Sequence, residues 1–269
     1  MYGSWLDLTP LWALFCGAVL TVAGSILVGL RIGSAMRHKG IKESVGTTVG
    51  AALGLLAFML GFTFNMTADR FDVRKQLFIN EISAISTSYL RAGFLPAPYD
   101  REIRQLLRDY VRERTVDYAD QEAVQTAIKR SEAIHQRMWS LIEIMNHEQP
   151  LTMAAGLLVR SLNEVIDLHT QRVVVGLQFR IPLTIWIGLF AVTLLTMMLV
   201  GYQCAQQRQK QHAVNAVLAI IFAAVVTLIM DLDRGVSGSG RVNQQPWLDL
   251  QSQLETWPVT ASPNLKRNG

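Results

Sequence analysis

Four long stretches of the chain lack aspartate, glutamate, lysine and arginine, and the charged residues are concentrated between them. These stretches are 8–30, 44–68, 181–207 and 211–230. A helix that crosses a membrane needs about 20 consecutive apolar residues, so each stretch is long enough to form one span. The pattern therefore predicts four transmembrane helices, with one hairpin before and one hairpin after a polar middle region.

The second stretch continues into the middle region without a proline or glycine after Gly61. Beyond Asp69, apolar residues recur every three or four positions as far as Tyr89. This spacing is typical of an amphipathic helix. One continuous helix is therefore predicted to run from the membrane to about Ala92.

The same rhythm predicts three further helices in the middle region, at 99–118, 120–146 and 151–180. Nothing in this region alternates with a two-residue period, so no strand is predicted. The C-terminal tail contains one short amphipathic stretch, which is expected to lie along the membrane interface or against the middle domain. Its apolar residues are Trp247, Leu250 and Leu254.

The predicted fold class is an all-α membrane protein in which two transmembrane hairpins flank a central helical extramembrane domain. The predicted boundaries are 1–68 for the first hairpin, 69–180 for the domain, 181–230 for the second hairpin and 231–269 for the polar tail. The first span could be mistaken for a signal peptide. It lacks a preceding basic segment and its apolar run is too long, so we expect a retained span.

Small residues recur along the first two predicted spans. In the second, Gly46, Gly50 and Gly54 are four residues apart, and in the first Gly17 belongs to a similar series that ends at Gly33. Four-residue spacing places small residues on one helix face, where a second helix backbone can approach closely. These glycines are therefore predicted to pack the first two spans against each other.

Basic residues favour a cytoplasmic position for the short loops inside the two hairpins. The loop over 31–43 contains four basic residues and one acid, and the second loop contains Arg208 and Lys210. The positive-inside rule then places the middle domain and both termini outside. Basic residues also occur on the domain side, but the first span has none before it and four after it, which decides the orientation.

Composition excludes several other classes of protein. Half of the residues are hydrophobic, 17% are charged, and the net charge of +4 is small and dispersed, so nothing indicates nucleic acid binding. Cys16 and Cys204 lie in or beside apolar stretches and provide no disulfide framework. No catalytic or nucleotide-binding motif is present, and the five histidines are isolated from one another in sequence. No enzymatic activity, metal site or cofactor is predicted.

Charged residues cluster where the second and fourth spans end, on the same side of the membrane. They are Asp69, Arg70, Asp231, Asp233 and Arg234. One interpretation is helix termination with ion pairing at the level of the lipid headgroups. The other is a ring of charge at the mouth of a pore or cavity in an oligomer. We favour termination and pairing, and the second interpretation stays open.

Two sequence signatures resemble the bestrophin-like family of membrane proteins. The first runs from Gly54-Leu55-Leu56-Ala57-Phe58 through Phe64 to Asp69-Arg70-Phe71-Asp72, followed by Glu81, Ala84-Ile85 and Tyr89-Leu90-Arg91. The second is Leu232-Asp233-Arg234, followed by Gly238, Val242 and Pro246. Both follow the family's order and spacing, except that Gly235 stands where the family usually has proline.

This resemblance implies the architecture of a channel. True bestrophins are pentameric anion channels in which the second span lines the pore and phenylalanines form its neck. By this resemblance, Phe58 and Phe62 are candidate pore-lining residues, and Asn65 lies near one end of the same span. Bestrophins also have a cytosolic helical domain, which is the reverse of the orientation inferred from the basic loops.

Two functions therefore stay open. The first is a homo-oligomeric channel in the inner cell membrane that conducts an anion such as chloride. The second is a non-conducting membrane protein whose helical domain binds a partner or ligand, as a sensor or scaffold. Polar residues that face a shared pore axis favour the first function, and a monomeric protein would exclude it.

Overall fold

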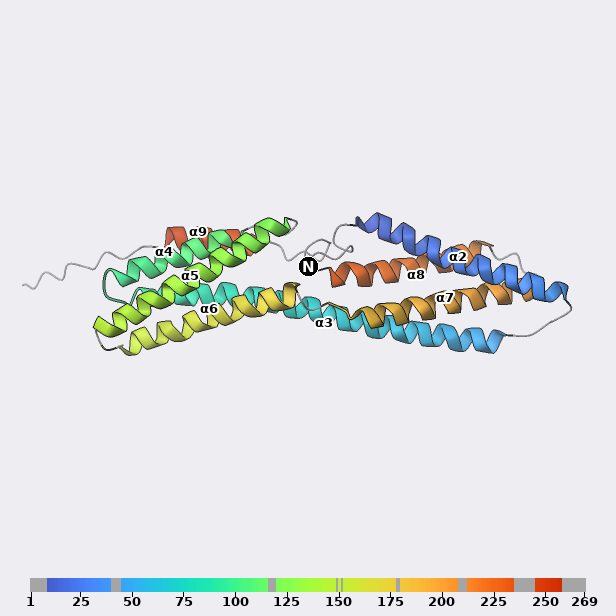
Figure 1. Cartoon of the computed structure of the whole chain (residues 1–269), viewed down its shortest axis with the longest axis horizontal. Coiled ribbons are helices and arrows are strands. Elements are labelled where there is room, and N and C mark those ends of the chain that lie inside the picture. Colours follow the sequence, from blue (N-terminus) through green and yellow to red (C-terminus); the bar gives the residue numbers. More distant parts are fainter. Residues whose placement is uncertain are drawn as a thin grey trace, which may run out of the picture. The chain divides into compact units, whose positions relative to one another are not determined.

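The computed structural model describes residues 9–39, 45–115, 120–148, 150, 152–177, 180–207, 212–234 and 245–257. Within these ranges the chain forms α-helices and no strand, which confirms the all-α class. The helices group into two compact units (Figure 1). Residues 3–72 and 179–241 form the first, here called the membrane unit. Residues 73–178 and 242–269 form the second, here called the extramembrane unit.

The membrane unit contains the four predicted spans. They are α2 (Leu11–His38), the first part of α3 (Gly46–Ala92), α7 (Leu183–Gln206) and α8 (His212–Asp233). Four described helices are long and apolar enough to cross a membrane, which agrees with the four charge-free stretches. Large apolar side chains such as Leu20, which is 72% exposed, cover the outside of this unit, as expected for contact with lipid.

Helix α2 extends further than predicted. It continues to His38, so Arg31 and Arg37 lie in the helix and the predicted loop over 31–43 is too long. The Arg37 Nη1 atom donates a hydrogen bond of 2.6 Å to the carbonyl oxygen of Ala205, near the end of α7. The last carbonyls of a helix have no partner inside that helix, so this arginine satisfies one of them.

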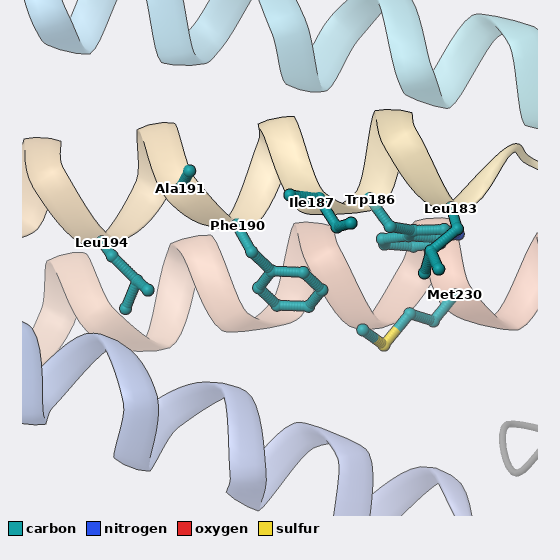
Figure 2. Close-up of a pocket in the computed structure, with 7 residues that line it drawn as sticks. All are labelled: Leu183, Trp186, Ile187, Phe190, Ala191, Leu194 and Met230. Carbon is teal, nitrogen blue, oxygen red and sulfur yellow. The ribbon is translucent and has the colours of Figure 1, made fainter.

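The core of the membrane unit lies among the four spans. Leu56 and Leu60 of α3 pack in one cluster with Leu189 and Met197 of α7 and with Ile229 of α8. Helix α2 contacts α7 and α8. In both views α7 and α8 lie between α2 and α3 (Figures 1 and 2).

The extramembrane unit combines the second part of α3 with α4 (Tyr99–Glu113), α5 (Gln121–Glu148), α6 (Met153–Leu177) and α9 (Gln245–Thr256). The predicted continuation of the second span to Ala92 is confirmed, and each further predicted helix is present with a shifted end. Trp247, Leu250 and Leu254 of α9 are buried in this unit's core, so the tail helix packs against the domain. The residues Arg208, Lys210, Gly235, Gly238 and Val242, named in the sequence analysis, lie outside the described residues, as do residues 40–44 of the first loop.

Candidate functional site

One face of α3 in the membrane unit is left uncovered by the rest of the chain. This face, here called the outward stripe, comprises Gly50, Gly54, Phe58, Phe62, Asn65 and Asp69, all of them exposed. The residues are three or four positions apart, which places them on one side of the helix. Phe58 is 71% exposed and Phe62 is 60% exposed. The structure therefore brings the three candidates Phe58, Phe62 and Asn65 onto one exposed face of α3.

The opposite face of α3 is buried. Leu56, Leu60, Thr63 and Thr67 are at most 6% exposed. The Thr63 and Thr67 hydroxyls donate hydrogen bonds of 2.7 and 2.5 Å to the carbonyl oxygens of Met59 and Thr63. The inner face thus satisfies its own polar groups, and only the outer face remains for another molecule or for solvent.

The outward stripe becomes polar at its end. The Asn65 side-chain amide donates a hydrogen bond of 3.2 Å to the Asp69 carboxylate. An amide or a carboxylate that faces hydrocarbon is costly, so such residues in a span usually face water or a neighbouring polar group. Arg70 is half-buried and does not belong to this face. Asp69 and Arg70 therefore lie on different sides of α3, although they are adjacent in sequence.

The three charged residues at the end of α8 are buried. Asp231, Asp233 and Arg234 are 6%, 2% and 5% exposed. Asp233 Oδ1 accepts a hydrogen bond of 3.1 Å from the backbone N–H of Ile181, just before α7 begins. Arg234 Nη2 donates one of 2.5 Å to the carbonyl oxygen of Thr9. These side chains tie chain segments together, which supports helix termination and pairing over a ring of exposed charge.

The predicted packing of the first two spans through their glycines differs from the structure. A Cβ atom added at Gly17, Gly50 or Gly54 would meet no atom within 4 Å, and one at Gly46 would meet only the Gln203 side chain of α7, at 3.3 Å. Helix α2 instead approaches α7 closely through other glycines. A Cβ atom at Gly29 would lie 1.9 Å from the Met198 carbonyl oxygen. The prediction was wrong about the partner because spacing identifies a small face but not the helix that meets it.

The extramembrane unit contains a buried polar cluster that the sequence analysis did not assemble. This group, here called the Glu81 cluster, draws one or two side chains from each of four helices or their ends. Its members are Glu81, Tyr110, Arg114, His135, His169 and Arg172. Glu81 is completely buried and lies in α3. Each helix thus places a polar side chain on an otherwise apolar face. A polar residue at such a position is the sequence signal that could have revealed the cluster.

The Glu81 carboxylate is the centre of this cluster. It accepts short hydrogen bonds from the Tyr110 hydroxyl and from Arg172, and Arg114 Nε lies 3.5 Å from Oε1. Burial by itself raises the pKa of Glu81, but the charges of Arg114 and Arg172 and the hydrogen bonds outweigh burial and lower this pKa to about 2. Glu81 therefore carries a negative charge at neutral pH.

The two histidines lie on the other side of Tyr110. Their ring centroids are 5.0 Å apart, and the Tyr110 ring is 4.7 Å from that of His135. His169 Nδ1 is 3.1 Å from the Tyr110 hydroxyl. Because that hydroxyl gives its single proton to Glu81, Nδ1 must be the N–H donor of this pair, which leaves Nε2 as the bare nitrogen.

A groove of the membrane unit that could hold a ligand is apolar. An open groove of about 390 Å³ lies along α7 and α8 (Figure 2). It is lined by Leu183, Trp186, Ile187, Phe190, Ala191, Leu194 and Met230. It offers no polar group to an ion. Among the described residues, no three His, Cys, Asp or Glu side chains are grouped to hold a metal.

Comparison with known proteins agrees with this architecture. The family model of the Bestrophin-like domain matches residues 12–247. Among solved structures, a point mutant of a bacterial bestrophin homologue from Klebsiella pneumoniae has a TM-score of 0.70 at 15% identity, over 91% of this chain and 97% of that one. A second mutant has a TM-score of 0.66 at 14% identity, over 92% and 100%. No curated protein matches the chain. At such identities the likeness shows the fold alone.

Proposed function

Because the chain belongs to the Bestrophin-like family, we propose that it is the subunit of a homo-oligomeric ion channel in the inner cell membrane. The outward stripe of α3 lines the pore. The observation that carries this proposal is the stripe itself, in which two exposed phenylalanines are followed by Asn65 and Asp69 on one uncovered face. Several copies of such a face around one axis would form an apolar neck that opens into a polar mouth.

Several details of the stripe support an assembly of identical subunits. Gly50 and Gly54 leave open space on the outer side of α3, where a neighbouring backbone could approach closely. In an oligomer, Asn65 and Asp69 would face the water of a pore, whereas in a single subunit they would face lipid. A mass measurement of the detergent-solubilised protein tests this part, because a monomer has no shared axis.

The charge of the stripe bears on the ion that passes. The expectation of an anion such as chloride rests on the family's relation to anion channels. Asp69 is the one charged member of the stripe, and carboxylates at a pore mouth attract cations. The geometry of this chain therefore favours cations at this mouth. A reversal potential measured between unequal KCl solutions distinguishes a cation-selective pore from an anion-selective one.

Currents through planar bilayers test conduction and the role of the stripe together. We expect Phe62→Ala to widen a hydrophobic neck and raise the current, and Asp69→Asn to shift the reversal potential towards chloride. Leu20→Ala is the control, because Leu20 is also a largely exposed apolar residue but lies on α2. If native protein and Phe62→Ala both stay folded and carry no current, the channel proposal is overturned. The alternative, a membrane protein whose helical domain binds a partner, then takes its place.

Cysteine labelling can test the orientation of the protein in the membrane. Cys16 is exposed and would react itself, so it is first replaced by serine. From the basic loops we expect Lys129→Cys, on the exposed side of α5, to react with a membrane-impermeant maleimide in spheroplasts. Lys39→Cys, at the end of α2, should stay unlabelled. The reverse labelling would place the helical domain in the cytoplasm.

A further inference from the structure

The Glu81 cluster contains two buried bases for which the channel proposal has no use. We infer that His135 and His169 form an acid-sensitive switch in the extramembrane unit. At neutral pH the two uncharged imidazoles complete the packing of α5 and α6 against α3 and α4. On acidification their protonation loosens that packing. This inference concerns the extramembrane unit alone and does not depend on whether the protein conducts ions.

The cluster does not stabilise a positive charge on either imidazole. His135 and His169 are 6% and 3% exposed. The Nε2 atom of each is buried and makes no hydrogen bond to a described residue. A protonated imidazole has two N–H donors, and a buried donor without an acceptor is costly. Protonation of either ring therefore demands either entry of water or movement of the helices.

The neighbouring charges also disfavour protonation of His169, whereas at His135 the opposing effect of Glu81 exceeds that of Arg114. Two arginines, Arg114 at the end of α4 and Arg172 on α6, face the histidines. One carboxylate, Glu81 on α3, opposes them. It already accepts hydrogen bonds from Tyr110 and Arg172 and forms an ion pair with Arg114. A further positive charge would therefore enter a site where positive charges already outnumber negative ones among the groups named.

Burial and these arginines lower the histidine pKa values. Burial lowers the pKa of His135 to about 4. The charge of Glu81 opposes this shift, and Arg114 adds a smaller lowering of the pKa. Burial, Arg114 and the neighbouring His135 lower the pKa of His169 to about 3. The other titratable groups of the cluster do not change charge near neutral pH. The pKa of Glu81 is about 2, and burial together with Glu81 raises that of Tyr110.

The sign of the pH dependence follows from these values. The ordinary histidine pKa is 6.5, so the unfolded or opened chain binds more protons than the closed unit as pH falls below about 6.5. The closed unit therefore loses stability progressively from about pH 6.5 down to the lowered pKa values near 4 and 3. Between pH 7.5 and 5.0 the opening equilibrium shifts by roughly 30-fold for each histidine.

Helix α9 contacts the same two arginines, so a change in the cluster is expected to affect its packing. The guanidinium groups of Arg172 and Arg114 lie 5.6 and 6.0 Å from the centre of the Trp247 ring. Phe78 of α3 packs edge-to-face against that ring at 5.7 Å. Trp247 is fully buried. Loosening of α5 and α6 around the arginines is thus expected to expose α9 as well.

Hydrogen exchange of the full-length protein in lipid nanodiscs tests the switch. Exchange is compared between pH 7.5 and 5.0 after correction for its intrinsic pH dependence. We expect the native protein to lose protection at pH 5.0 in 131–145 of α5, in 161–172 of α6 and in α9. Segments of α2 and α7 should keep theirs, because they belong to the other unit.

Variants then assign the effect to the two histidines. His135→Gln combined with His169→Gln removes both titrating groups, so protection in α5 and α6 should no longer depend on pH, whatever its level at pH 7.5. His147→Gln is the control, because His147 is an exposed histidine of α5, and it should behave as the native protein. If the double variant does not fold, each single variant should remove about half of the shift on a logarithmic scale. An unchanged shift in the variants, or its absence in the native protein, overturns the inference.

Discussion

The hydroxyls inside the membrane spans and the buried charges of the extramembrane unit find their partners in different ways. In the membrane unit, the hydroxyls of Thr63, Thr67 and Thr193 each donate to the carbonyl oxygen four residues earlier in the same helix. In the extramembrane unit, Glu81 of α3 instead draws its partners from α4 and α6, across the core. A helix in lipid must satisfy its polar groups before it packs, whereas a domain in water can satisfy them through packing.

The units also differ in how their helices approach each other. In the membrane unit, Gly29, Gly33 and Gly201 bring the backbones of α2 and α7 into contact. In the extramembrane unit, large side chains such as Tyr89, Tyr110 and Trp247 fill the space between helices. Lipid provides no hydrophobic force between spans, so close backbone contact replaces the burial of large side chains. The stability of the membrane unit should therefore fall when atoms are added between its helices. The stability of the extramembrane unit should fall when a buried side chain loses its partner.

The largest effect is expected where a buried charge loses its partner. Glu81→Gln leaves Arg114 and Arg172 without their shared carboxylate, and breaking a buried ion pair in this way costs about 3–5 kcal/mol. Thermal unfolding of the purified protein measures the loss. Glu143→Gln, at an exposed position on α5, is the control and should have little effect. Equal melting temperatures of the two variants would contradict a central role for Glu81.

A smaller but clear loss is expected from one added methyl group between α2 and α7. The Cβ atom of Gly201→Ala would lie 2.1 Å from the carbonyl oxygen of Ile26, so the helices must separate. Overpacking of this kind costs about 1–3 kcal/mol. Gly17→Ala adds the same atom where nothing lies within 4 Å. Comparison of the two melting temperatures separates crowding from the general effect of alanine, and similar values would exclude close packing at Gly201.

A third effect concerns the start of α7. Asp233→Ala removes the acceptor of the Ile181 N–H, and a buried donor without a partner costs about 1–3 kcal/mol. Asp233→Asn retains an oxygen that can accept the same hydrogen bond and should restore most of the stability. Melting temperatures of both variants test this prediction. If asparagine is as destabilising as alanine, the negative charge matters more than the hydrogen bond.

The smallest effect is expected on the outward stripe. Gly54→Ala adds a methyl group where no atom of the chain lies within 4 Å. Because alanine favours the helix over glycine by about 1 kcal/mol, a dissociated subunit with this substitution should be as stable as the native one or slightly more so, whereas in an oligomer the methyl group would crowd a neighbouring backbone. Marked destabilisation of the detergent-solubilised protein would instead indicate that another subunit covers this face, and a mass measurement on the same sample distinguishes the two causes.

The sequence by itself determined the elements of this protein. Four charge-free stretches determined the spans, because about 20 apolar residues suffice to cross a membrane whatever their neighbours are. The uninterrupted rhythm from Gly61 to Tyr89 determined that α3 continues out of the apolar stretch. All of these depend on residues within a few turns of each other, where spacing alone sets the geometry.

Only the tertiary structure decided which of these faces meet. Gly17 and Gly29 belong to the same series in sequence, yet only Gly29 lies where α7 crosses α2. Asp69 and Asp233 both end a span, but the first is exposed and the second is buried against Ile181. Glu81 and Arg172 are 91 positions apart and form one ion pair. Such contacts depend on how whole helices dock, and no local spacing along the chain records that docking.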